Sequence, residues 1–529
     1  MSADAGAAPL VAEPATLADL IALHAAHDPA RAALIYEGRT FAYGELDAHV
    51  ERAANAFAHA GVRPGDRVAL MFGNDPAYVA AFYGIARVGG VVVPINPMYR
   101  HSEIEHILRD SEPVAALVDA ALFADVGDAF VAAGLATLAV AGAHAVQAPA
   151  ASWEAMLAAA PPRAPVAVAP DDLAALVYTS GTTGKAKGAM HSHATLLANC
   201  RQAGRLERRF IGADDRVLVA IPISHMYGMQ SGMNGIFRVG GSMVLMPRFH
   251  PTDVPANVER YRCTMLLGAP PMFTRWVGMA DVASYDWSSL RVVTCGAAPL
   301  KASVIDAFRD LTGVRVSESY GLTEAGPTSH SNSAGPVDKV GSVGPPVPQV
   351  DCRLVDADGR DVARGEPGEI VLRSPGMMLG YWRNPEATAA TIRNGWLYTG
   401  DVAVVDEDGY YTIVDRLKDM ISVGGFKVWP LEIENALLEH PGIAEAAIVG
   451  VRDADAAERP LAFVVRAPGS GVTAEDLAAF ARGSLARYKV PVRFEFVDAL
   501  PRLVTGKILR RDLRARAQAL VDGGALSGL

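Results

Sequence analysis

A segment rich in glycine and hydroxyl side chains directly follows an apolar run and carries groups that bind phosphate. It reads Tyr-Thr-Ser-Gly-Thr-Thr-Gly-Lys-Ala-Lys-Gly over residues 178–188. Glycines let the backbone approach a ligand closely, and the hydroxyl and ammonium groups add donors for a polyphosphate. Gly184 follows Gly181 by only three residues, which excludes a Walker A motif. A short loop of this composition is often a solvated turn, but the full string favours phosphate binding. The predicted phosphate-binding residues are Thr179, Ser180, Gly181, Thr182, Thr183, Gly184 and Lys187.

The same string resembles the phosphate loop of the adenylate-forming superfamily, which includes acyl-CoA and aryl-CoA ligases, peptide-synthetase adenylation domains and firefly luciferase. The family has proline where this chain has Ala186, a change that removes no donor. Further motifs occur in the family's order from about residue 18 to 515. The resemblance implies ATP-dependent activation of a carboxylic acid as an acyl-adenylate. It also implies Mg²⁺ at the phosphates and coenzyme A as the acceptor of the acyl group.

Two motifs resemble the parts of the family's site that hold adenine and phosphate. One is Glu-Ser-Tyr-Gly-Leu-Thr-Glu over residues 318–324. The resemblance implies that Tyr320 packs against adenine, Thr323 contacts phosphate and Glu324 ligates Mg²⁺. A carboxylate is the hard oxygen ligand that this ion prefers. The other motif, Gly-Ala-Ala-Pro-Leu, resembles the turn beside adenine, with Ala297 in place of a glycine. The predicted nucleotide-binding residues in these motifs are Gly296, Ala297, Ala298, Pro299, Glu318, Ser319, Tyr320, Gly321 and Thr323.

Two further motifs resemble the family's ribose site and its hinge. In Tyr-Thr-Gly-Asp, we expect Asp401 to accept hydrogen bonds from both ribose hydroxyls, as acidic groups that face a vicinal diol do. In Asp-Arg-Leu-Lys-Asp, we expect Arg416 to reach the ribose or a phosphate. Lys418 would be the hinge of a mobile domain. Asp419 is expected to be solvated.

The loop after the hinge and a motif near the end of the chain resemble the segments that serve the family's two half-reactions. The residues Gly424, Gly425 and Phe426 resemble a loop that lines the pantetheine tunnel during thioester formation. Lys507, in Val-Thr-Gly-Lys, aligns with the catalytic lysine, which bridges the attacking carboxylate and the α-phosphate. Arg510 and the arginine after it are expected to be surface charges.

A histidine-containing segment, Pro-Ile-Ser-His-Met-Tyr-Gly-Met, resembles the family's acyl pocket. We expect His225 to gate the acyl and CoA channels as a catalytic residue, although such a histidine can also be a hydrogen-bonded core residue. The predicted pocket residues are His225, Met226, Tyr227, Ser231, Gly296 and Gly321. They are mostly apolar or small, and no aspartate lies near His225 to bind an amino group. An apolar monocarboxylate is therefore favoured, with a medium- or long-chain fatty acid first and an aromatic acid next.

Amphipathic and apolar segments that alternate along the chain must position these residues. Residues 43–59 place apolar side chains at helical spacing, and residues 67–72 form a short apolar run after a turn. Alternation of this kind predicts an α/β fold with parallel strands and helical crossovers. We therefore expect a large N-terminal domain, residues 1–415, made of two α/β subdomains and a small distorted β-barrel. A small mobile α+β domain is expected over residues 416–529, with the hinge near residues 415–418.

Composition and charge exclude several classes of function. The chain has 529 residues and a formal net charge of -10, so nucleic acid is not an expected partner. The four cysteines have wide, irregular spacing, which favours reduced thiols over disulfides or a zinc site. No secretory signal or uninterrupted apolar span is recognisable, so we expect a cytoplasmic protein without a transmembrane segment. The oligomeric state is left open, with a homodimer as one option.

Three functions remain as alternatives to the acyl-CoA ligase. An adenylating enzyme could load a separate carrier protein instead of coenzyme A. A catalytically silent acyl or nucleotide binder is a second alternative, against which the presence of Lys507, Glu324 and Asp401 argues. A luciferase-like oxygenase is a remote third, since no motif in the sequence bears on that activity.

Overall fold

A computed structural model describes residues 12–142, 146–179, 185–206, 209–424, 426–452, 458–502 and 508–522. The chain divides into two compact units. The first contains Met1–Asp351 and Arg373–Leu397, and the second contains Cys352–Leu372 and Tyr398–Leu529. The two units are defined by their compactness alone. The boundary between functional domains that we expect at residue 415 stays a prediction.

One sheet of the first unit is parallel through most of its width. Its strand order is β20-β9-β8-β4-β3-β5-β6-β7, and only β9 and β20 run antiparallel to their neighbours among the described strands. The strands are β3 (Arg67–Met71), β4 (Val91–Ile95), β5 (Ala115–Asp119), β6 (Thr137–Ala141), β7 (Ala150–Ser152), β8 (Leu173–Thr179), β9 (Lys187–Ser192) and β20 (Gly380–Tyr381). In β3, Val68 and Leu70 join one apolar cluster while Ala69 and Met71 join another, so both faces are buried. This double burial explains why the strand reads as a continuous apolar run.

The second sheet of this unit has the order β17-β16-β15-β14-β12-β13-β1-β2 and is parallel from β16 to β1. Its strands are β1 (Ala32–Tyr36), β2 (Arg39–Ala42), β12 (Arg216–Val219), β13 (Ser242–Leu245), β14 (Met265–Gly268), β15 (Val292–Cys295), β16 (Val316–Gly321) and β17 (Thr328–Ser331). The short strands β10 (Arg205–Leu206) and β11 (Arg209–Phe210) pair with each other. The predicted α/β class with two α/β subdomains is confirmed.

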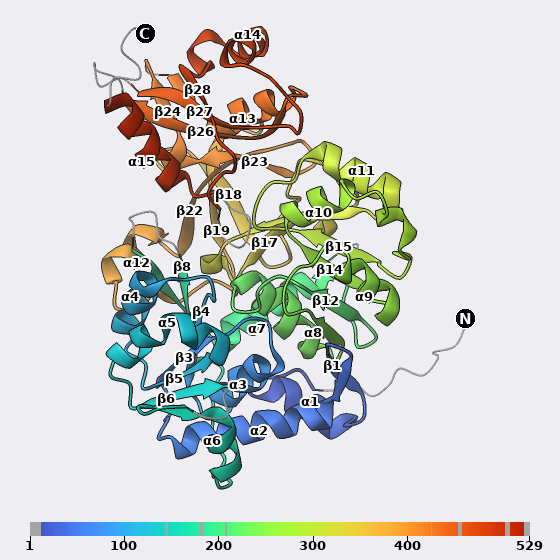
Figure 1. Ribbon diagram of the computed structural model, residues 1–529, viewed down its shortest axis with the longest axis vertical. Coiled ribbons are helices and arrows are strands. Elements are labelled where there is room, and N and C mark those ends of the chain that lie inside the picture. Colours follow the sequence, from blue (N-terminus) through green and yellow to red (C-terminus); the bar gives the residue numbers. More distant parts are fainter. Residues whose placement is uncertain are drawn as a thin grey trace. The chain divides into compact units, whose positions relative to one another are not determined.

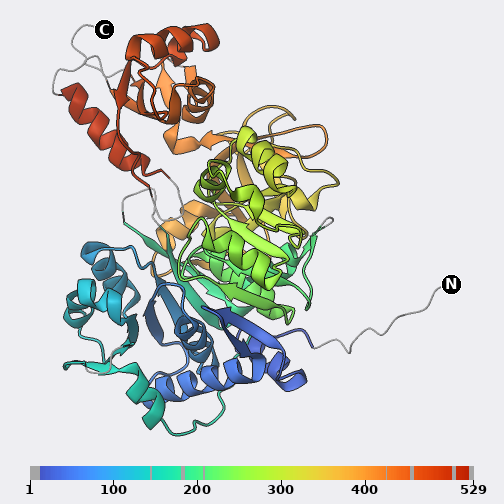
Figure 2. The same cartoon turned by 45° about the vertical axis from the view of Figure 1, so that its right-hand side comes forward.

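Helices cover both sheets, as parallel strands with crossovers require (Figure 1). They are α1 (Asp19–His27), α2 (Tyr43–His59), α3 (Pro76–Arg87), α4 (His101–Ser111), α5 (Ala120–Ala132), α6 (Trp153–Ala159), α7 (His193–Gly204), the π-helix η1 (Gly228–Asn234), α8 (Gly235–Arg238), α9 (Asp253–Tyr261), α10 (Pro270–Val277), α11 (Ala302–Thr312) and α12 (Pro385–Thr391). Figure 2 shows the blue-to-cyan segments beside the green ones from another side. The helix predicted over residues 43–59 is confirmed as α2. Helix α3 begins where the side chain of Asp75 accepts a hydrogen bond from Ala77 N, with proline as the first helical residue.

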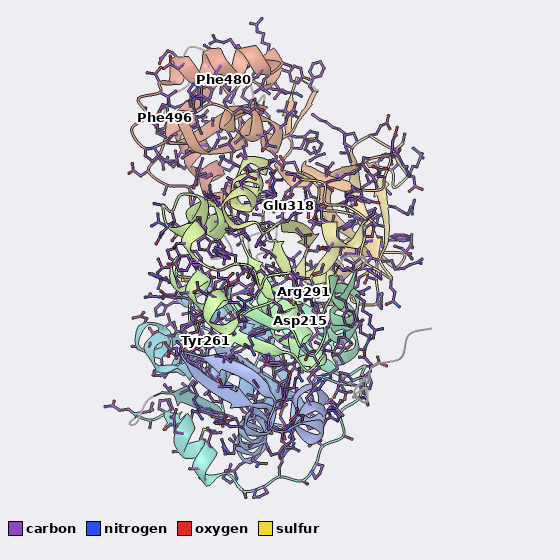
Figure 3. All side chains as sticks on the ribbon, turned by 90° about the vertical axis from the view of Figure 1, so that its right-hand side faces the viewer. Asp215, Tyr261, Arg291, Glu318, Phe480 and Phe496 are labelled. Atoms are coloured by element: carbon purple, nitrogen blue, oxygen red, sulfur yellow. The ribbon has the colours of Figure 1, made fainter. Side chains whose placement is uncertain are left out.

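A buried carboxylate fastens the amino ends of three neighbouring strands in the second sheet. Asp215, just before β12, accepts hydrogen bonds from Arg291 Nε at 3.0 Å and Thr264 Oγ1 at 2.7 Å. Arg291 and Thr264 directly precede β15 and β14. Figure 3 shows Asp215 and Arg291 next to each other, away from Glu318. Because Cys295 at the end of β15 is paired with Glu318, Glu318 lies toward the opposite, carboxyl edge.

The second unit contains two sheets and a hairpin. One sheet has β18 (Asp351–Val355), β19 (Gly368–Arg373), β22 (Trp396–Val405) and β23 (Tyr411–Arg416), and the hairpin has β24 (Ile421–Val423) and β25 (Phe426–Val428). The other sheet has β26 (Ile443–Arg452), β27 (Glu458–Arg466) and β28 (Arg493–Phe496). Side chains of β26 alternate between two apolar clusters. Ile448 packs with residues of α13 (Pro430–Leu438) and α14 (Ala474–Ser484), while Ala447 packs with residues of α15 (Arg510–Leu520). Helices therefore cover both faces of this sheet (Figure 1).

The cysteines and the apolar segments agree with the sequence analysis. Cys200, Cys263 and Cys295 are buried free thiols, and Cys352 is a partly buried free thiol. Among the described residues, no helix combines the length and the apolar character that crossing a bilayer requires.

A cluster of buried charges joins α15 to the rest of the second unit, and it corrects two expectations. Arg510 is not a surface charge, because its side chain is 18% exposed and donates from Nη2 to Glu434 Oε2 at 2.9 Å. Arg510 Nη1 also donates to the carbonyl of Ile448 at 2.8 Å. Asp419 is not solvated, because it is 6% exposed and accepts from Arg514 Nη2 at 3.0 Å. Both expectations failed because local sequence does not report which charges are packed against distant elements.

Breaking this cluster from one side should destabilise the second unit. Arg510→Met leaves the Glu434 carboxylate buried without its partner, which is expected to lower the free energy of unfolding by about 3–5 kcal/mol. The double variant Arg510→Met, Glu434→Leu removes both charges and should lose much less. Denaturant unfolding of the second unit measures both changes. Arg511→Met is the matched control because that side chain is 74% exposed, and an equal loss in the control would contradict the assigned role of Arg510.

Candidate active site

The predicted nucleotide motifs of the first unit follow the carboxyl ends of its strands. Thr179 is the last residue of β8, and Gly296 comes directly after β15. Tyr320 and Gly321 end β16, and Glu324 follows in a short 3-10 helix, Thr323–Ala325. Ligands of open α/β sheets bind outside the carboxyl ends of the strands, at a point where the strand order reverses. The fold therefore gathers these residues at the edge where such ligands are found.

The carboxylate of Glu324 is the polar centre of this edge. Its Oε1 accepts hydrogen bonds from Thr179 Oγ1 at 3.2 Å and from the hydroxyl of Tyr381 at 2.9 Å. Among the described residues, Oε2 has no hydrogen-bond partner in the structure. Thr179 belongs to one sheet and Glu324 follows a strand of the other, so this carboxylate links the carboxyl edges of both sheets.

Tyr381 is a site residue that sequence reasoning missed. It lies in β20, which pairs with β9 so that Tyr381 is opposite Ala189. The ammonium of Lys187 lies 5.0 Å from the centre of the Tyr381 ring, within the range of a cation–π interaction. Burial and the Glu324 carboxylate raise the pKa of Tyr381 far above its ordinary value, so the phenol stays protonated and donates. The string Gly-Tyr-Trp that contains it gives only a weak signal by itself.

His191 is a second residue that the sequence did not single out. Its Nε2 lies 3.0 Å from the carbonyl oxygen of Thr323, and burial lowers the pKa of His191 to about 4. The ring is therefore neutral near pH 7 and donates to that carbonyl, and Thr195 Oγ1 lies 3.4 Å from Nδ1. These contacts fix the backbone of the turn that carries Thr323 and Glu324.

The predicted adenine turn contains a residue in a conformation that favours glycine. Ala297 has φ of +73°, in the left-handed region. The Cβ of a non-glycine residue makes this conformation unfavourable by roughly 1–2 kcal/mol. The left-handed φ therefore explains why the family resemblance leads us to expect a glycine at position 297. A Cβ at Gly296 would meet the ring of Tyr227 at 3.4 Å, so the turn also lies against the acyl-pocket segment.

Gly321 is required by the path of the chain after β16. A Cβ at this position would lie 1.5 Å from the carbonyl oxygen of Pro327, so no other residue fits without moving the backbone. The preceding Tyr320 is partly buried, and its ring centre lies 5.7 Å from that of His330. A partly exposed face of Tyr320 therefore stays at the edge where adenine is expected.

Glu318 is a buried carboxyl at the same edge (Figure 3). It accepts a hydrogen bond from Gly341 N at 2.9 Å, and it interacts with the backbone of Leu300 at the end of the adenine turn. Burial raises the pKa of Glu318 to about 7, and the negative charge of Asp338 acts in the same direction. The thiol of Cys295 also faces this carboxyl, and its own pKa is raised by burial and by Glu318.

The predicted acyl-pocket residues are close in sequence but differ in surroundings. Met226 is fully buried in the apolar core, and His225 is partly buried, with Nδ1 accepting from Tyr227 N at 3.3 Å. The hydroxyl of Tyr227 shares a 3.0 Å hydrogen bond with Thr294 Oγ1. Ser231 lines a small cavity of about 10 Å³ between α7, η1 and β14, which has room for about one water molecule. The other residues that line this cavity are Asn199, Cys200, Ala203, Gly204, Ile211, Gln230, Gly235, Met265 and Leu267.

In the second unit, the structure brings together two residues expected at the ribose. Asp401 in β22 is opposite Arg416 in β23, and Arg416 Nε lies 2.9 Å from Asp401 Oδ1. The Asp401 side chain is 8% exposed and that of Arg416 is 35% exposed. Lys418 lies in the 3-10 helix η5 (Leu417–Asp419), where burial lowers its pKa. Phe426 is exposed in the hairpin β24–β25, and its ring stacks on Tyr488 at 4.6 Å.

Several predicted site residues lie outside the described part of the chain. They are Ser180, Gly181, Thr182, Thr183 and Gly184 of the phosphate loop, Gly425 of the hairpin, and Lys507. Their roles stay predictions from the sequence.

The oxygen atoms of Glu324 and Thr179 suit Mg²⁺, but they do not form a complete metal site by themselves. Among the described residues, no group of three or more His, Cys, Asp or Glu side chains could hold a metal. Glu324 supplies one carboxylate, and Thr179 supplies a hydroxyl beside it. Mg²⁺ usually takes one or two carboxylates and completes its shell with waters and substrate phosphates.

The raised pKa of Glu318 predicts a pH-dependent stability. The pKa is about 7 in the folded protein against an ordinary value of 4.5, so the folded state binds more protons between these values. Stability should therefore fall as pH rises through this window and level off above it, by up to about 3 kcal/mol. Glu318→Gln keeps an acceptor for Gly341 N but does not titrate. Its melting temperature relative to wild type should rise from about pH 5 to about pH 8. A difference that does not change with pH would contradict this prediction. Glu366→Gln, at an exposed position, is the control variant.

Comparison with known proteins identifies the chain's family. The family model of the AMP-binding enzyme matches residues 21–382, and the model of the AMP-binding enzyme C-terminal domain matches residues 432–507. The chain is 38% identical over 501 residues to a feruloyl-CoA synthase of Amycolatopsis sp. The alignment covers 92% of this chain and 96% of that synthase. It is 35% identical to a long-chain-fatty-acid–CoA ligase of Bacillus subtilis (strain 168), with 94% of each chain covered.

A solved structure agrees with these matches. The structure of the anthranilate CoA ligase AuaEII in complex with anthranoyl-AMP superposes with a TM-score of 0.87 at 29% identity. The alignment covers 96% of this chain and 99% of that one. The site geometry, the family models and the relatives agree. The chain therefore belongs to the AMP-binding enzyme family, the adenylate-forming superfamily, and is an AMP-forming acyl-CoA ligase.

Proposed function

We propose that this ligase converts an apolar monocarboxylic acid to its acyl-AMP and then to its thioester with coenzyme A. The observation that carries the proposal is the carboxylate of Glu324, held by Thr179 and Tyr381 next to the ammonium of Lys187. An anionic oxygen ligand and a cation at the carboxyl edge of the sheets are the pair that a metal–polyphosphate complex needs.

In the first step, the carboxylate of the acid attacks the α-phosphorus of ATP, and pyrophosphate leaves. Both reactants are anionic, and two unit charges 4 Å apart repel by roughly 4 kcal/mol at an effective dielectric constant of about 20. Lys507 offsets this repulsion by bridging the attacking carboxylate and the α-phosphate, where charge shifts in the transition state. Lys187 and the hydroxyls of the phosphate loop hold the β- and γ-phosphates. Mg²⁺, with Glu324 as its protein ligand, supplies further neutralisation of phosphate charge when bound.

This proposal assigns separate residues to the adenine and to the ribose of ATP. Tyr320 and the adenine turn at Gly296 supply the faces that contact the base. Asp401 accepts from the ribose hydroxyls, and Arg416 orients that carboxylate. The 2.9 Å contact between Arg416 and Asp401 supports this assignment, since a paired carboxylate keeps its charge and direction.

In the second step, the thiol of coenzyme A attacks the mixed anhydride, which forms the thioester and releases AMP. We infer that Lys507 withdraws and that Gly424, Gly425 and Phe426 enter with the thiol as the second domain turns about Lys418. One site that serves two half-reactions needs such a hinge movement. His225 serves as the gate between the acyl and CoA channels.

Two classes of acid have specific support. A medium- or long-chain fatty acid is supported by the mostly apolar or small residues of the predicted acyl pocket and by the long-chain-fatty-acid–CoA ligase among the relatives. An aromatic acid is supported by the feruloyl-CoA synthase among the relatives and by the hydroxyl of Tyr227 beside Thr294.

Removal of the proposed catalytic ammonium should separate the two half-reactions. Lys507→Ala is expected to slow acid-dependent pyrophosphate release by at least about 10²-fold, as the loss of one preorganised electrostatic donor does. Thioester formation from supplied acyl-AMP should be unchanged, because that step does not use Lys507. Arg511→Ala removes a nearby exposed cation as the control. Unchanged adenylation in Lys507→Ala would show that another group carries out this role.

An acid panel should define the substrate and the acceptor. Pyrophosphate release is measured over fatty acids of increasing length and over benzoates and cinnamates, with and without coenzyme A. Ser231 is a predicted acyl-pocket residue, so Ser231→Leu should lower kcat/KM for the longest accepted acids by about tenfold or more, since one bulky group in a pocket changes binding by roughly 1–3 kcal/mol. Ser102→Leu, at an exposed position of α4, is the control. Release of free acyl-AMP that coenzyme A does not change would instead favour a carrier protein as acceptor.

A further inference from the structure

One aromatic side chain contacts both the anionic and the cationic group of the proposed phosphate site. The hydroxyl of Tyr381 donates to Glu324 Oε1 at 2.9 Å. The face of the same ring lies 5.0 Å from Lys187 Nζ. Tyr381 is 7% exposed, so the hydroxyl and the ring have little water to compete with these two partners.

The backbone around Tyr381 holds this side chain in place. Tyr381 N donates to Thr388 Oγ1 at 2.9 Å, and the next residue, Trp382, donates from its N to the carbonyl of Gly188 at 2.8 Å. Strand β20 thus attaches to β9 next to Lys187, the first residue of β9. The segment that carries Tyr381 is therefore fixed to the strand that carries the cation.

The hydroxyl of Tyr381 leaves one oxygen of Glu324 available. Both Tyr381 and Thr179 donate to Oε1, whereas Oε2 has no hydrogen-bond partner among the described residues. A carboxylate with one oxygen fixed by two donors has a restricted orientation, because rotation of the side chain would break both bonds. The second oxygen is then the acceptor that can bind a cation.

We propose that Tyr381 is a positioning residue that sets the direction of the Glu324 carboxylate through its hydroxyl and holds the Lys187 ammonium through its ring. This inference rests on the proposed binding of a metal–ATP complex at this edge. It separates two functions within one side chain. The hydroxyl governs binding of the metal, and the ring governs binding of the phosphates.

Tyr381→Phe tests the role of the hydroxyl because it keeps the ring under Lys187. Mn²⁺ replaces Mg²⁺ as a probe that electron paramagnetic resonance detects, with ATP present. The affinity for Mn²⁺ should fall by about tenfold, which is the effect of losing one hydrogen bond to a charged group. The affinity for ATP in EDTA should stay within about twofold of wild type. The Mg²⁺ concentration that half-saturates pyrophosphate release should rise in parallel, while KM for the acid stays constant.

Tyr381→Leu tests the role of the ring because it removes the hydroxyl and the aromatic face together. In addition to the loss of metal affinity, the affinity for ATP in EDTA should fall by about threefold or more, as the loss of a cation–π contact predicts. Tyr78→Phe is the matched control. The hydroxyl of Tyr78 is buried without a hydrogen-bond partner, so its removal should change neither titration.

The outcomes distinguish this inference from the proposed function. If wild type binds Mn²⁺ and ATP and Tyr381→Phe behaves like Tyr78→Phe, Tyr381 does not position Glu324. If Tyr381→Phe and Tyr381→Leu bind ATP in EDTA equally well, the ring does not hold Lys187. If wild type itself binds no ATP, the proposed function fails first and this inference fails with it. Melting curves of each variant show whether a loss comes from unfolding.

Discussion

The hydrogen bonds of Thr179 and Tyr381 to the Glu324 carboxylate are the interaction on which the proposed nucleotide site depends. Thr179 ends a strand of one sheet, and Glu324 follows a strand of the other. Tyr381 comes from a short strand added at the edge of the first sheet. A carboxylate that is partly removed from water needs hydrogen-bond donors. Because the donors to Glu324 come from two other segments, these hydrogen bonds hold the three segments together. The same requirement leaves one carboxylate oxygen for a ligand.

The two ends of the strands carry charge in different ways. At the amino ends, Asp215 is satisfied by Arg291 and Thr264, and this closed network ties strands together. At the carboxyl ends, Glu318 is buried without a cationic partner among the residues that the structure describes, and its pKa is raised to about 7. Full pairing stabilises structure, whereas incompletely paired groups at the carboxyl edge remain responsive to ligands and protons. The difference explains how one sheet can be rigid and still present reactive groups.

In the second unit, a partly exposed ion pair and a buried ion pair lie close together in the sequence. Asp401 and Arg416 pair across neighbouring strands, with the carboxylate buried and the arginine one-third exposed. Asp419, three residues beyond Arg416, is instead buried and paired with Arg514 of α15. The residues around the expected hinge therefore include one that is anchored inside the unit and one that faces solvent. One end of the segment is therefore attached to a helix, while the other end keeps a partly exposed arginine.

Local sequence determined the elements and the motifs, because their physical causes act over a few residues. Helical spacing over residues 43–59 and the apolar run over residues 67–72 predict elements that the structure confirms as α2 and β3. The glycine expected at position 297 is explained by a left-handed φ, which is also a local property. The domain boundary and the role of Lys507 stay predictions.

Only the tertiary structure decided which charges are buried and which groups meet. Tyr381 and Glu324 are 57 residues apart in the sequence, and no periodic pattern connects them. Arg510 and Asp419 were expected at the surface, yet each is packed against elements far away in the chain. The burial and pairing of a polar side chain depend on how distant strands and helices pack, and the neighbouring residues in the sequence do not predict that packing.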